Sequence, residues 1–194
     1  MSFEVLEPSY FTTIQDKGRF GFSNIGVTTS GVMDEFAFYI INKLLLNHEN
    51  SNVLEIVFSN LQLKALKNTQ IAISGGNCDF FINNIKKNTW GSHNIKENDI
   101  VKIGKINEGT RVYLGVKGGF NIPKEFKSNS TTIKENLGGL NGNKLNKGDI
   151  LEYKKYELPF NTRLKNEFIP KYEDELELRV VLSYQEDFFS KEEI

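Results

Sequence analysis

Residues that build disulfides and metal centres are scarce in this sequence. Its 194 residues include one cysteine, Cys78, and two histidines, His48 and His93. A single cysteine excludes an intrachain disulfide, and the two histidines do not have the spacing of a metal-ligand set. We therefore expect no metal site, and a fold that relies on its own hydrophobic core.

An excess of one charge and long hydrophobic runs are also missing. The formal net charge is −1, from 24 basic and 25 acidic residues, so no basic surface for nucleic acid or an anionic membrane is indicated. The first residues, MSFEVLEPSY, lack the basic and apolar regions of a signal peptide, and no apolar run approaches the length of a membrane span. We expect a cytoplasmic protein that binds neither nucleic acid nor membrane.

The patterns that are present predict one helix and many short strands. Apolar residues recur at steps of three and four from Met33 to Leu45, which predicts a helix with one buried face. Beyond Ser51 the pattern changes to the alternating or continuous apolar runs that are typical of strands. Strands are expected at 53–58, 61–66, 69–74, 78–83, 99–104, 110–116, 149–153 and 176–182, after shorter ones near 3–6 and 11–14. Together with glycine-rich turns, this favours a β-rich barrel or sandwich.

The stretch from Thr13 to Asp34 is long, polar and interrupted by four glycines, between a predicted strand and the predicted helix. Long ordered loops of this kind are usually functional. Asp16, Arg19 and Asp34 are its candidate catalytic groups, because a carboxylate and a guanidinium can orient a small acid or amide and stabilise developing charge. In the structural alternative, Asp16 and Arg19 form a salt bridge that fixes the loop, and Asp34 only caps the helix. The residues alone do not separate these interpretations.

Other polar segments carry weaker signals. A second polar loop, SNSTTIKENLGGLNGN, runs from Ser128 to Asn143. His48 and His93 are expected in turns and Cys78 in the core, so a nucleophilic triad is not indicated. The sequence contains no Walker motif, and GGLNGN lacks the dinucleotide-binding spacing. Any nucleotide contact would be of another type or made by a partner chain.

Several short motifs follow one another in a fixed order between residues 3 and 153. They are TIQDKGRFG at 13–21, Gly26-Val27, SGVMD at 30–34, Asn42-Lys43-Leu44, Asn47, Leu54-Glu55, RVYLGVKGG at 111–119, Gly138-Gly139 and LNKGDIL at 145–151. In this order they resemble the biotin-dependent carboxyltransferase family. That family includes the C subunit of 5-oxoprolinase, also known as allophanate hydrolase subunit 2, and the carboxyltransferase part of urea carboxylase.

The resemblance implies a fold and a division into domains. Members of the family have two similar cyclophilin-like β-barrel halves, with the site in the cleft between them. On this basis residues 1–155 are expected to form a mainly β, cyclophilin-like N-terminal domain with one or two helices. Residues 156–194 are expected to be a linker and the first strand of a missing or truncated second half. We expect the chain alone to be inactive, and the sequence leaves open whether it is truncated or naturally short.

The resemblance also implies a function. The chain would be the C subunit of a bacterial ATP-dependent 5-oxoprolinase, which opens 5-oxo-L-proline to L-glutamate together with subunits A and B. ATP would be the cofactor, shared with a partner subunit, and the substrate a small amide. Asp16, Arg19 and Asp34 would be the catalytic residues. The substrate-binding residues would be Gln15, Ser30, Gly31, Tyr113, Ser128, Ser130 and Thr131.

Two departures from the family pattern bear on the substrate, and two other functions stay open. Asn129 and Asn143 stand where the family has arginines, so two five-donor cations are lost. One alternative is a biotin-dependent carboxyltransferase acting on urea or a related amide. Because no biotinyl-lysine context occurs in the sequence, the biotin would come from another domain or chain. The other alternative is a non-catalytic module that binds a histidine kinase inhibitor.

Overall fold

The computed structural model describes residues 1–58, 60–154 and 160–172, followed by residues 175, 177, 179, 181, 183–184, 188–190 and 192. The described part contains nine strands, one α-helix and three 3-10 helices, so the prediction of a mainly β fold with one or two helices is confirmed. The strands are β1 (Ser2–Glu7), β2 (Phe11–Gln15), β3 (Val53–Val57), β4 (Leu61–Ala65), β5 (Thr69–Ile82), β6 (Ile85–Lys86), β7 (Gly91–Ile95), β8 (Ile100–Val116) and β9 (Ile150–Glu152). The helices are α1 (Glu35–Leu44), η1 (Ser23–Ile25), η2 (Ile133–Glu135) and η3 (Asn166–Phe168).

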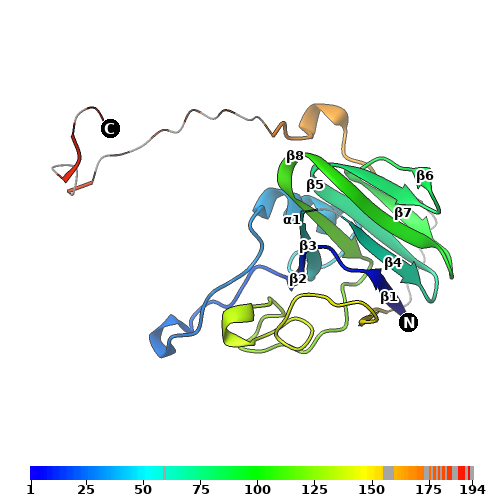
Figure 1. Ribbon diagram of the computed structural model, residues 1–194, viewed down its shortest axis with the longest axis horizontal. Helices are drawn as coiled ribbons and strands as arrows, with labels where there is room; N and C mark the ends of the chain where they lie inside the picture. The colour runs from blue at the N-terminus through cyan, green and yellow to red at the C-terminus, as the bar shows by residue number, and fades with distance from the viewer. Residues whose placement is uncertain are drawn as a thin grey trace.

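The strands form one antiparallel sheet that curls into a half-barrel (Figure 1). The strand order is β2-β3-β8-β4-β1-β9, and β5 pairs with β8, β7 and β6. Strand β8 is shared by three neighbours. Its residues 100–103 pair with β4, its residues 111–114 pair with β3, and β5 pairs with it along both parts. This shared use of one long strand joins the two parts of the curled sheet.

Strands β5 and β8 are each one long strand where the sequence predicts two. The glycine-rich segment within β5 is expected to interrupt the sheet, but it bends the strand instead. Gly75 has a φ of 91°, and the register with β8 shifts between Gly75 and Asn77. A Cβ on Gly76 would lie 2.5 Å from the carbonyl oxygen of Glu108. These glycines therefore form a bulge with close backbone approach, which leaves the strand continuous.

Strand β7 is also missing from the prediction, which places His93 in a turn. That placement is wrong, because His93 lies in β7 opposite Ile71 of β5. Its ring packs edge-on against Phe80, with 5.2 Å between ring centroids. Burial lowers the pKa of His93. The strand expected at 176–182 falls largely outside the described residues.

The two faces of the sheet carry two hydrophobic clusters. The larger cluster fills the inside of the curl and includes Ile14, Leu54, Val112 and Ile73 from neighbouring strands. The smaller cluster lies between the other face of the sheet and α1. The helix residues Ala37, Phe38, Ile41 and Leu44, with Leu45 at the C-terminal cap, are buried there. This confirms the helix that the periodicity predicts.

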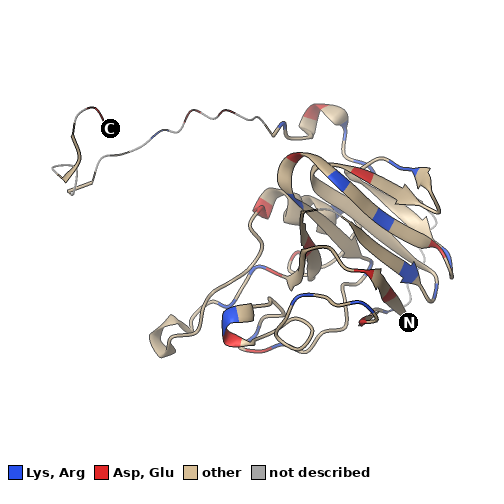
Figure 2. Ribbon diagram, in the orientation of Figure 1, with Lys and Arg blue, Asp and Glu red and all other residues tan. Residues whose placement is uncertain are grey.

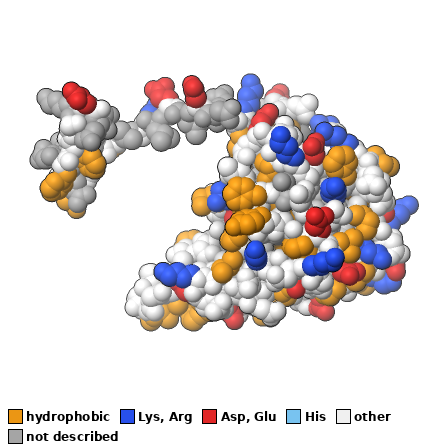
Figure 3. Space-filling view, viewed as in Figure 1, with side chains coloured by type: hydrophobic (Ala, Val, Ile, Leu, Met, Phe, Trp, Pro, Cys, Tyr) orange, Lys and Arg blue, Asp and Glu red, His pale blue; other side chains and the backbone are white. Residues whose placement is uncertain are grey.

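Helix α1 lies close to the sheet because a glycine faces it. A Cβ on Gly115 of β8 would lie 2.9 Å from Leu45 and 3.2 Å from Ile41. The outward face of the helix keeps hydrophobic side chains exposed, with 67 % of Met33 and 46 % of Phe36 accessible. Figure 3 shows hydrophobic side chains gathered over this region.

Positively and negatively charged residues are interspersed along the strands and loops (Figure 2). This distribution agrees with the near-zero net charge of the sequence. None of the helices in the described residues has the length and hydrophobicity that crossing a membrane requires.

Residues 160–172, which the sequence assigns to a linker, lie against the domain. The N–H of Ser92 in β7 donates to the carbonyl of Thr162, and the N–H of Thr162 donates to the Ser92 hydroxyl at 2.7 Å. The Thr162 hydroxyl donates to the carbonyl of Leu44 at 2.5 Å. Leu164 and Tyr172 pack against the cluster beneath α1. The segment thus covers the edge strand β7 and one flank of the helix.

The bend in β5 gives a first testable prediction. We expect Gly76→Ala to lower the free energy of unfolding by about 2 kcal/mol, because its methyl group would meet the Glu108 backbone and force the two strands apart. Urea denaturation measures this loss. Gly104→Ala is the matched control, since its Cβ would lie 3.3 Å from its nearest neighbours in Asp79. Equal losses for both variants would contradict the close-approach explanation.

Candidate functional site

The polar stretch between β2 and α1 is held by a crossing of its own backbone. Segments 16–19 and 29–32 are joined by two backbone hydrogen bonds of 2.7 and 3.0 Å. At the crossing, a Cβ on Gly18 would lie 2.6 Å from the carbonyl oxygen of Ser30, and one on Gly31 would lie 2.7 Å from that of Lys17. Both glycines have positive φ angles. Gly31 is therefore required by the close approach of the two segments.

Asp16 lies at the centre of a buried cluster and is 0 % exposed. Its Oδ1 accepts hydrogen bonds from Gly18 N at 2.8 Å and from the hydroxyls of Ser128 and Ser130 at 2.6 Å each. Its Oδ2 accepts from Asn129 N at 2.7 Å. One carboxylate thus joins the first polar loop to the second across more than a hundred residues. We call Asp16 with residues 128–130 the carboxylate clamp.

Arg19 is also buried, at 1 % exposure, and binds the same second loop. Its guanidinium donates to the carbonyl of Ser130 and, at 3.0 Å, to the hydroxyl of Thr132. Although both side chains are described, no ion pair joins Arg19 to Asp16, so the salt bridge of the structural alternative is not formed. The loop is instead fixed by two charged groups that each hold residues 128–132.

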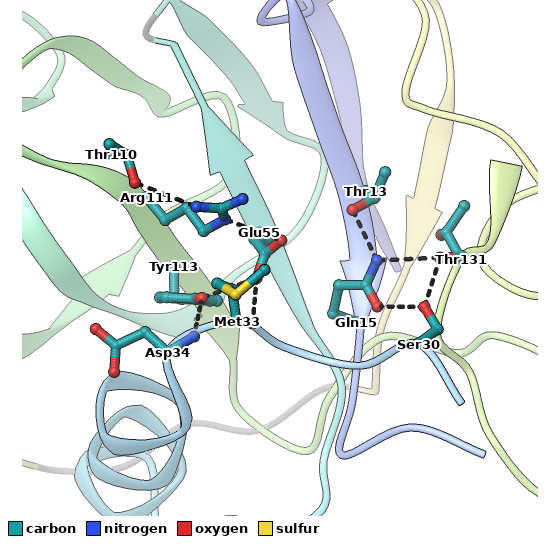
Figure 4. Close-up of polar contacts among 10 residues, drawn as sticks. All are labelled: Thr13, Gln15, Ser30, Met33, Asp34, Glu55, Thr110, Arg111, Tyr113 and Thr131. Atoms are coloured by element: carbon teal, nitrogen blue, oxygen red, sulfur yellow. Dashed lines mark hydrogen bonds and ion pairs between the residues drawn. The ribbon is translucent and has the colours of Figure 1, made fainter. Parts of the chain in front are cut away.

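A group of amide and hydroxyl side chains lies next to the clamp (Figure 4). Gln15 Nε2 donates to the hydroxyl of Thr13 at 2.9 Å and to the carbonyl of Thr131 at 3.2 Å. The Ser30 hydroxyl lies 3.0 Å from the same carbonyl and 3.5 Å from Gln15 Oε1. The structure therefore brings together three of the predicted substrate-binding residues.

A row of polar residues crosses the helix-facing side of the sheet. Thr13 of β2 is opposite Glu55 of β3, Glu55 is opposite Tyr113 of β8, and Tyr113 is opposite Ser74 of β5. Directly opposed side chains in a sheet have Cβ atoms about 5 Å apart. The Gln15 group and the Glu55 group are thus neighbours on one face.

Glu55 and Tyr113 bind the start of α1 (Figure 4). Glu55 Oε2 accepts from the Tyr113 hydroxyl at 2.8 Å and from Met33 N at 2.9 Å. The same hydroxyl accepts from Asp34 N at 2.8 Å. Burial, reinforced by the negative charge of Glu55, raises the pKa of Tyr113, which keeps it a proton donor. Arg111 Nε lies 3.6 Å from Glu55 Oε1.

Asp34 caps α1, as the structural alternative expects. Its Oδ1 accepts from Ala37 N at 2.8 Å, the usual geometry of an N-cap. Its Oδ2 accepts from the Tyr172 hydroxyl at 2.8 Å. Burial is the main cause that raises the pKa of Tyr172, and the hydrogen bond to Asp34 adds to it. Asp34 therefore also ties residues 160–172 to the helix.

The predicted site residues thus fall into two neighbouring sets. Asp16, Arg19 and the hydroxyls of Ser128 and Ser130 are buried, and their polar contacts are within the protein. Half-exposed groups border the start of α1, namely Ser30, Asp34 and the guanidinium of Arg111, whose side chain is 31 % exposed. The Ser30 hydroxyl and the Arg111 guanidinium retain exposed surface, whereas the Gln15 amide is 6 % exposed, so the first two are the groups that can bind the amide and carboxylate of a small molecule.

Two members of this arrangement, Glu55 and Arg111, are absent from the predicted site. Glu55 is a single carboxylate in the apolar run VLEIV, where it is 7 % exposed. A charged residue in the middle of a buried strand needs a partner, and that signal could have marked it. Arg111 carries no such signal, because it lies near the start of the expected strand 110–116, where a charged side chain is ordinary.

Reactive groups of other kinds do not contribute to the site. Cys78 lies in the interior of the curl at 5 % exposure, and burial raises the pKa of its thiol to about 12. In the part of the chain that the structure describes, no three His, Cys, Asp or Glu side chains are placed to hold a metal ion.

Comparison with known proteins places this geometry in context. A family model described as carboxyltransferase domain, subdomain A and B, matches residues 25–194. A urea amidolyase of Lachancea kluyveri is 35 % identical over 158 residues, which are 81 % of this chain and 9 % of that protein. A 5-oxoprolinase C subunit of Escherichia coli is 31 % identical over 148 residues, which are 76 % of this chain and 48 % of that protein.

A solved structure gives the same result. The crystal structure of the K. lactis urea amidolyase matches with a TM-score of 0.78 and 35 % identity, over 88 % of this chain and 10 % of that one. The chain therefore spans about half of the 5-oxoprolinase C subunit and about a tenth of each of these urea amidolyases.

The carboxylate clamp gives a prediction for stability. We expect Asp16→Asn to lower the free energy of unfolding by about 3 kcal/mol, because the new NH2 group would face N–H or O–H donors at either oxygen position. Chemical denaturation followed by circular dichroism measures the change. Asp79→Asn is the control, since Asp79 makes an exposed ion pair with Lys86 worth less than about 1 kcal/mol. A loss for Asp16→Asn as small as the control would show that the clamp is unimportant.

The position of Cys78 gives a prediction for the reactivity of its thiol. We expect the native protein to react very slowly with a thiol reagent such as DTNB, because the thiol is buried and its pKa of about 12 leaves little thiolate in mildly alkaline buffer. In denaturant one equivalent should react at once. Fast labelling of the native protein would mean that the curl of the sheet opens.

Proposed function

Because the chain belongs to the family of the carboxyltransferase domain, subdomains A and B, we propose that it works in an enzyme that activates a small amide. In its specific form, the proposal is that the chain provides part of the C subunit of an ATP-dependent 5-oxoprolinase, together with subunits A and B. The observation that carries the proposal is a set of polar groups near the start of α1. They are the Ser30 hydroxyl with the Gln15 amide beside it, and the guanidinium of Arg111.

The relatives include both kinds of enzyme and differ in how much of each protein this chain covers. The matched region makes up 48 % of both 5-oxoprolinase C subunits, from Haemophilus influenzae and Escherichia coli. It makes up between 9 and 16 % of the urea amidolyases and the putative urea carboxylase. A substrate with one ring amide and one carboxylate suits the available groups. Ser30, oriented by Gln15, would bind the lactam, and Arg111 would bind the carboxylate.

The residues at the start of α1 do not form a phosphate site. The free N–H groups at a helix N-terminus often bind phosphate, but here Asp34 occupies that position and its negative charge opposes an anion. We therefore assign ATP to a partner subunit. The role of this chain is then to bind and orient the amide while the phosphate donor comes from outside.

In this proposal the predicted catalytic residues Asp16, Arg19 and Asp34 do not contact the substrate, but position the groups that do. Asp16 and Arg19 hold residues 128–132, so they position the neighbouring Thr131 carbonyl against which Gln15 and Ser30 are oriented. Asp34 caps the helix. The N–H groups of Met33 and Asp34, just before the helix, bind Glu55 and Tyr113. These are positioning roles, since their polar groups are directed at the protein itself.

The alternative with urea as substrate is supported by the 35 % identity to the Lachancea urea amidolyase and by two further urea enzymes that match 98 % of this chain at 32 % identity. In that alternative the same amide-binding groups hold urea, and a biotinylated carrier supplies the carboxyl group. Urea has no carboxylate, so Arg111 would contribute little to its binding. The two substrates therefore differ in their dependence on this residue.

The test is 5-oxoproline-dependent ATP hydrolysis by the complete gene product mixed with subunits A and B. We expect hydrolysis in the mixture, and a loss of kcat/KM of about a hundredfold for Arg111→Gln, because a fixed bidentate cation is removed. Arg163→Gln is the control. The guanidinium of Arg163 bonds only to Asn166 among the described residues, and its loss should leave the rate unchanged.

Each of the other outcomes points to a different function. Carboxyl transfer from a biotinylated carrier to urea, without 5-oxoproline turnover, would establish the alternative. Stable assembly with the B subunit but no turnover of either substrate would indicate a non-catalytic binding module.

A further inference from the structure

A pocket borders the carboxylate clamp at Asn129, and we call it the second pocket to distinguish it from the amide site. It has a volume of about 290 Å³. Its walls come from the 48–52 turn, the 118–124 loop, Asn129 and Lys154. The proposed amide site does not use it, although Gly118 and Gly119 of the motif RVYLGVKGG line it.

Two buried asparagines build the walls of this pocket. Asn52, at 4 % exposure, binds both backbone groups of Phe120: its Oδ1 accepts from Phe120 N at 2.7 Å and its Nδ2 donates to Phe120 O at 3.0 Å. Asn129, at 5 % exposure, donates from Nδ2 to the carbonyls of Ile122 at 2.8 Å and Pro123 at 3.2 Å. The 118–124 loop is therefore fixed at both ends by side chains, so the pocket is preformed.

Asn129 also connects the pocket to the clamp, because its backbone N–H donates to Asp16 Oδ2. This gives a role to one of the positions at which the chain departs from its family. An arginine at 129 could not reproduce the same pair of short contacts to the loop, since its donors lie at the end of a long flexible side chain.

The charge of the pocket is one-sided. Among the described residues that line it are two lysines, Lys124 and Lys154, and one histidine, His48, and none of them is acidic. Both lysines are exposed, and neither ammonium has a hydrogen-bond or ion-pair partner in the described part of the chain. Of the neighbouring carboxylates, Glu49 is paired with Lys17 at 2.9 Å, and Glu152, which accepts from Asn121 at 3.1 Å, keeps its negative charge.

We propose that this pocket binds a small oxyanion, a carboxylate or phosphate group, between Lys124 and Lys154. The lining amides supply further donors, and the absence of acidic side chains from the described lining leaves the positive charge uncompensated. A preformed polar cavity with unpaired cations favours an anion because binding requires no rearrangement of its walls. The inference does not depend on the amide function, which uses other residues.

The experiment is a titration of the full chain with acetate and, separately, with inorganic phosphate, followed by backbone amide NMR. We expect saturable shifts of the amides of residues 118–121, and an affinity about tenfold lower in the double variant Lys124→Gln/Lys154→Gln, as for two exposed ion pairs. Raising the salt concentration should weaken binding further in the native protein than in the variant. Saturation by acetate alone or by phosphate alone would support the proposal and identify the group.

The matched control is Lys105→Gln/Lys147→Gln, which removes two exposed lysines that do not line the pocket. This variant should bind as the native protein does, and unchanged spectra outside the pocket show that each variant is folded. Shifts that do not saturate, or that are the same in the Lys124/Lys154 variant, would overturn the proposal.

Discussion

The buried carboxylate of Asp16 is the interaction on which the candidate site depends. A carboxylate without contact to water is stable only if donors compensate it, and here four N–H and O–H groups from both polar loops do so. Three of these donors lie more than a hundred residues further along the chain. The second loop is therefore placed by the first, and with it the Thr131 carbonyl that orients Gln15 and Ser30. On its opposite side the same carboxylate places Asn129, which holds a wall of the second pocket.

A related dependence exists at the start of α1. A polar row is costly on a sheet face that packs against a helix, unless the helix provides partners. The residues just before α1 do this, because the N–H groups of Met33 and Asp34 donate to Glu55 and to the Tyr113 hydroxyl. The helix N-terminus thus compensates the row, and the row fixes the position of the helix. Gly115 permits the close packing that this requires.

The sequence predicted the elements that are determined by residues close to them in the chain. The predictions were wrong where contacts with residues far along the chain determine the structure. Helix α1 follows from apolar spacing and from Asp34, which are both local. The continuity of β5 and β8 was missed, because glycine ends a strand in one context and forms a bulge in another, and only the approach to Glu108 decides between them. The structure brings several of the predicted site residues together, but the structural alternative paired Asp16 with Arg19. Their true partners lie in a loop whose position no local pattern indicates.

Burial separates the residues that build this site from those that can meet a ligand. Asp16, Arg19 and Tyr113 are almost fully enclosed, and their contacts already use the protein's own groups. Substituting them changes stability and position together, so a loss of activity would not reveal which was responsible. Arg111, Ser30 and the lysines of the second pocket retain exposed surface and can be changed with little effect on the core. Groups of this kind, supported by a rigid interior, are the ones through which a β-rich domain binds small molecules.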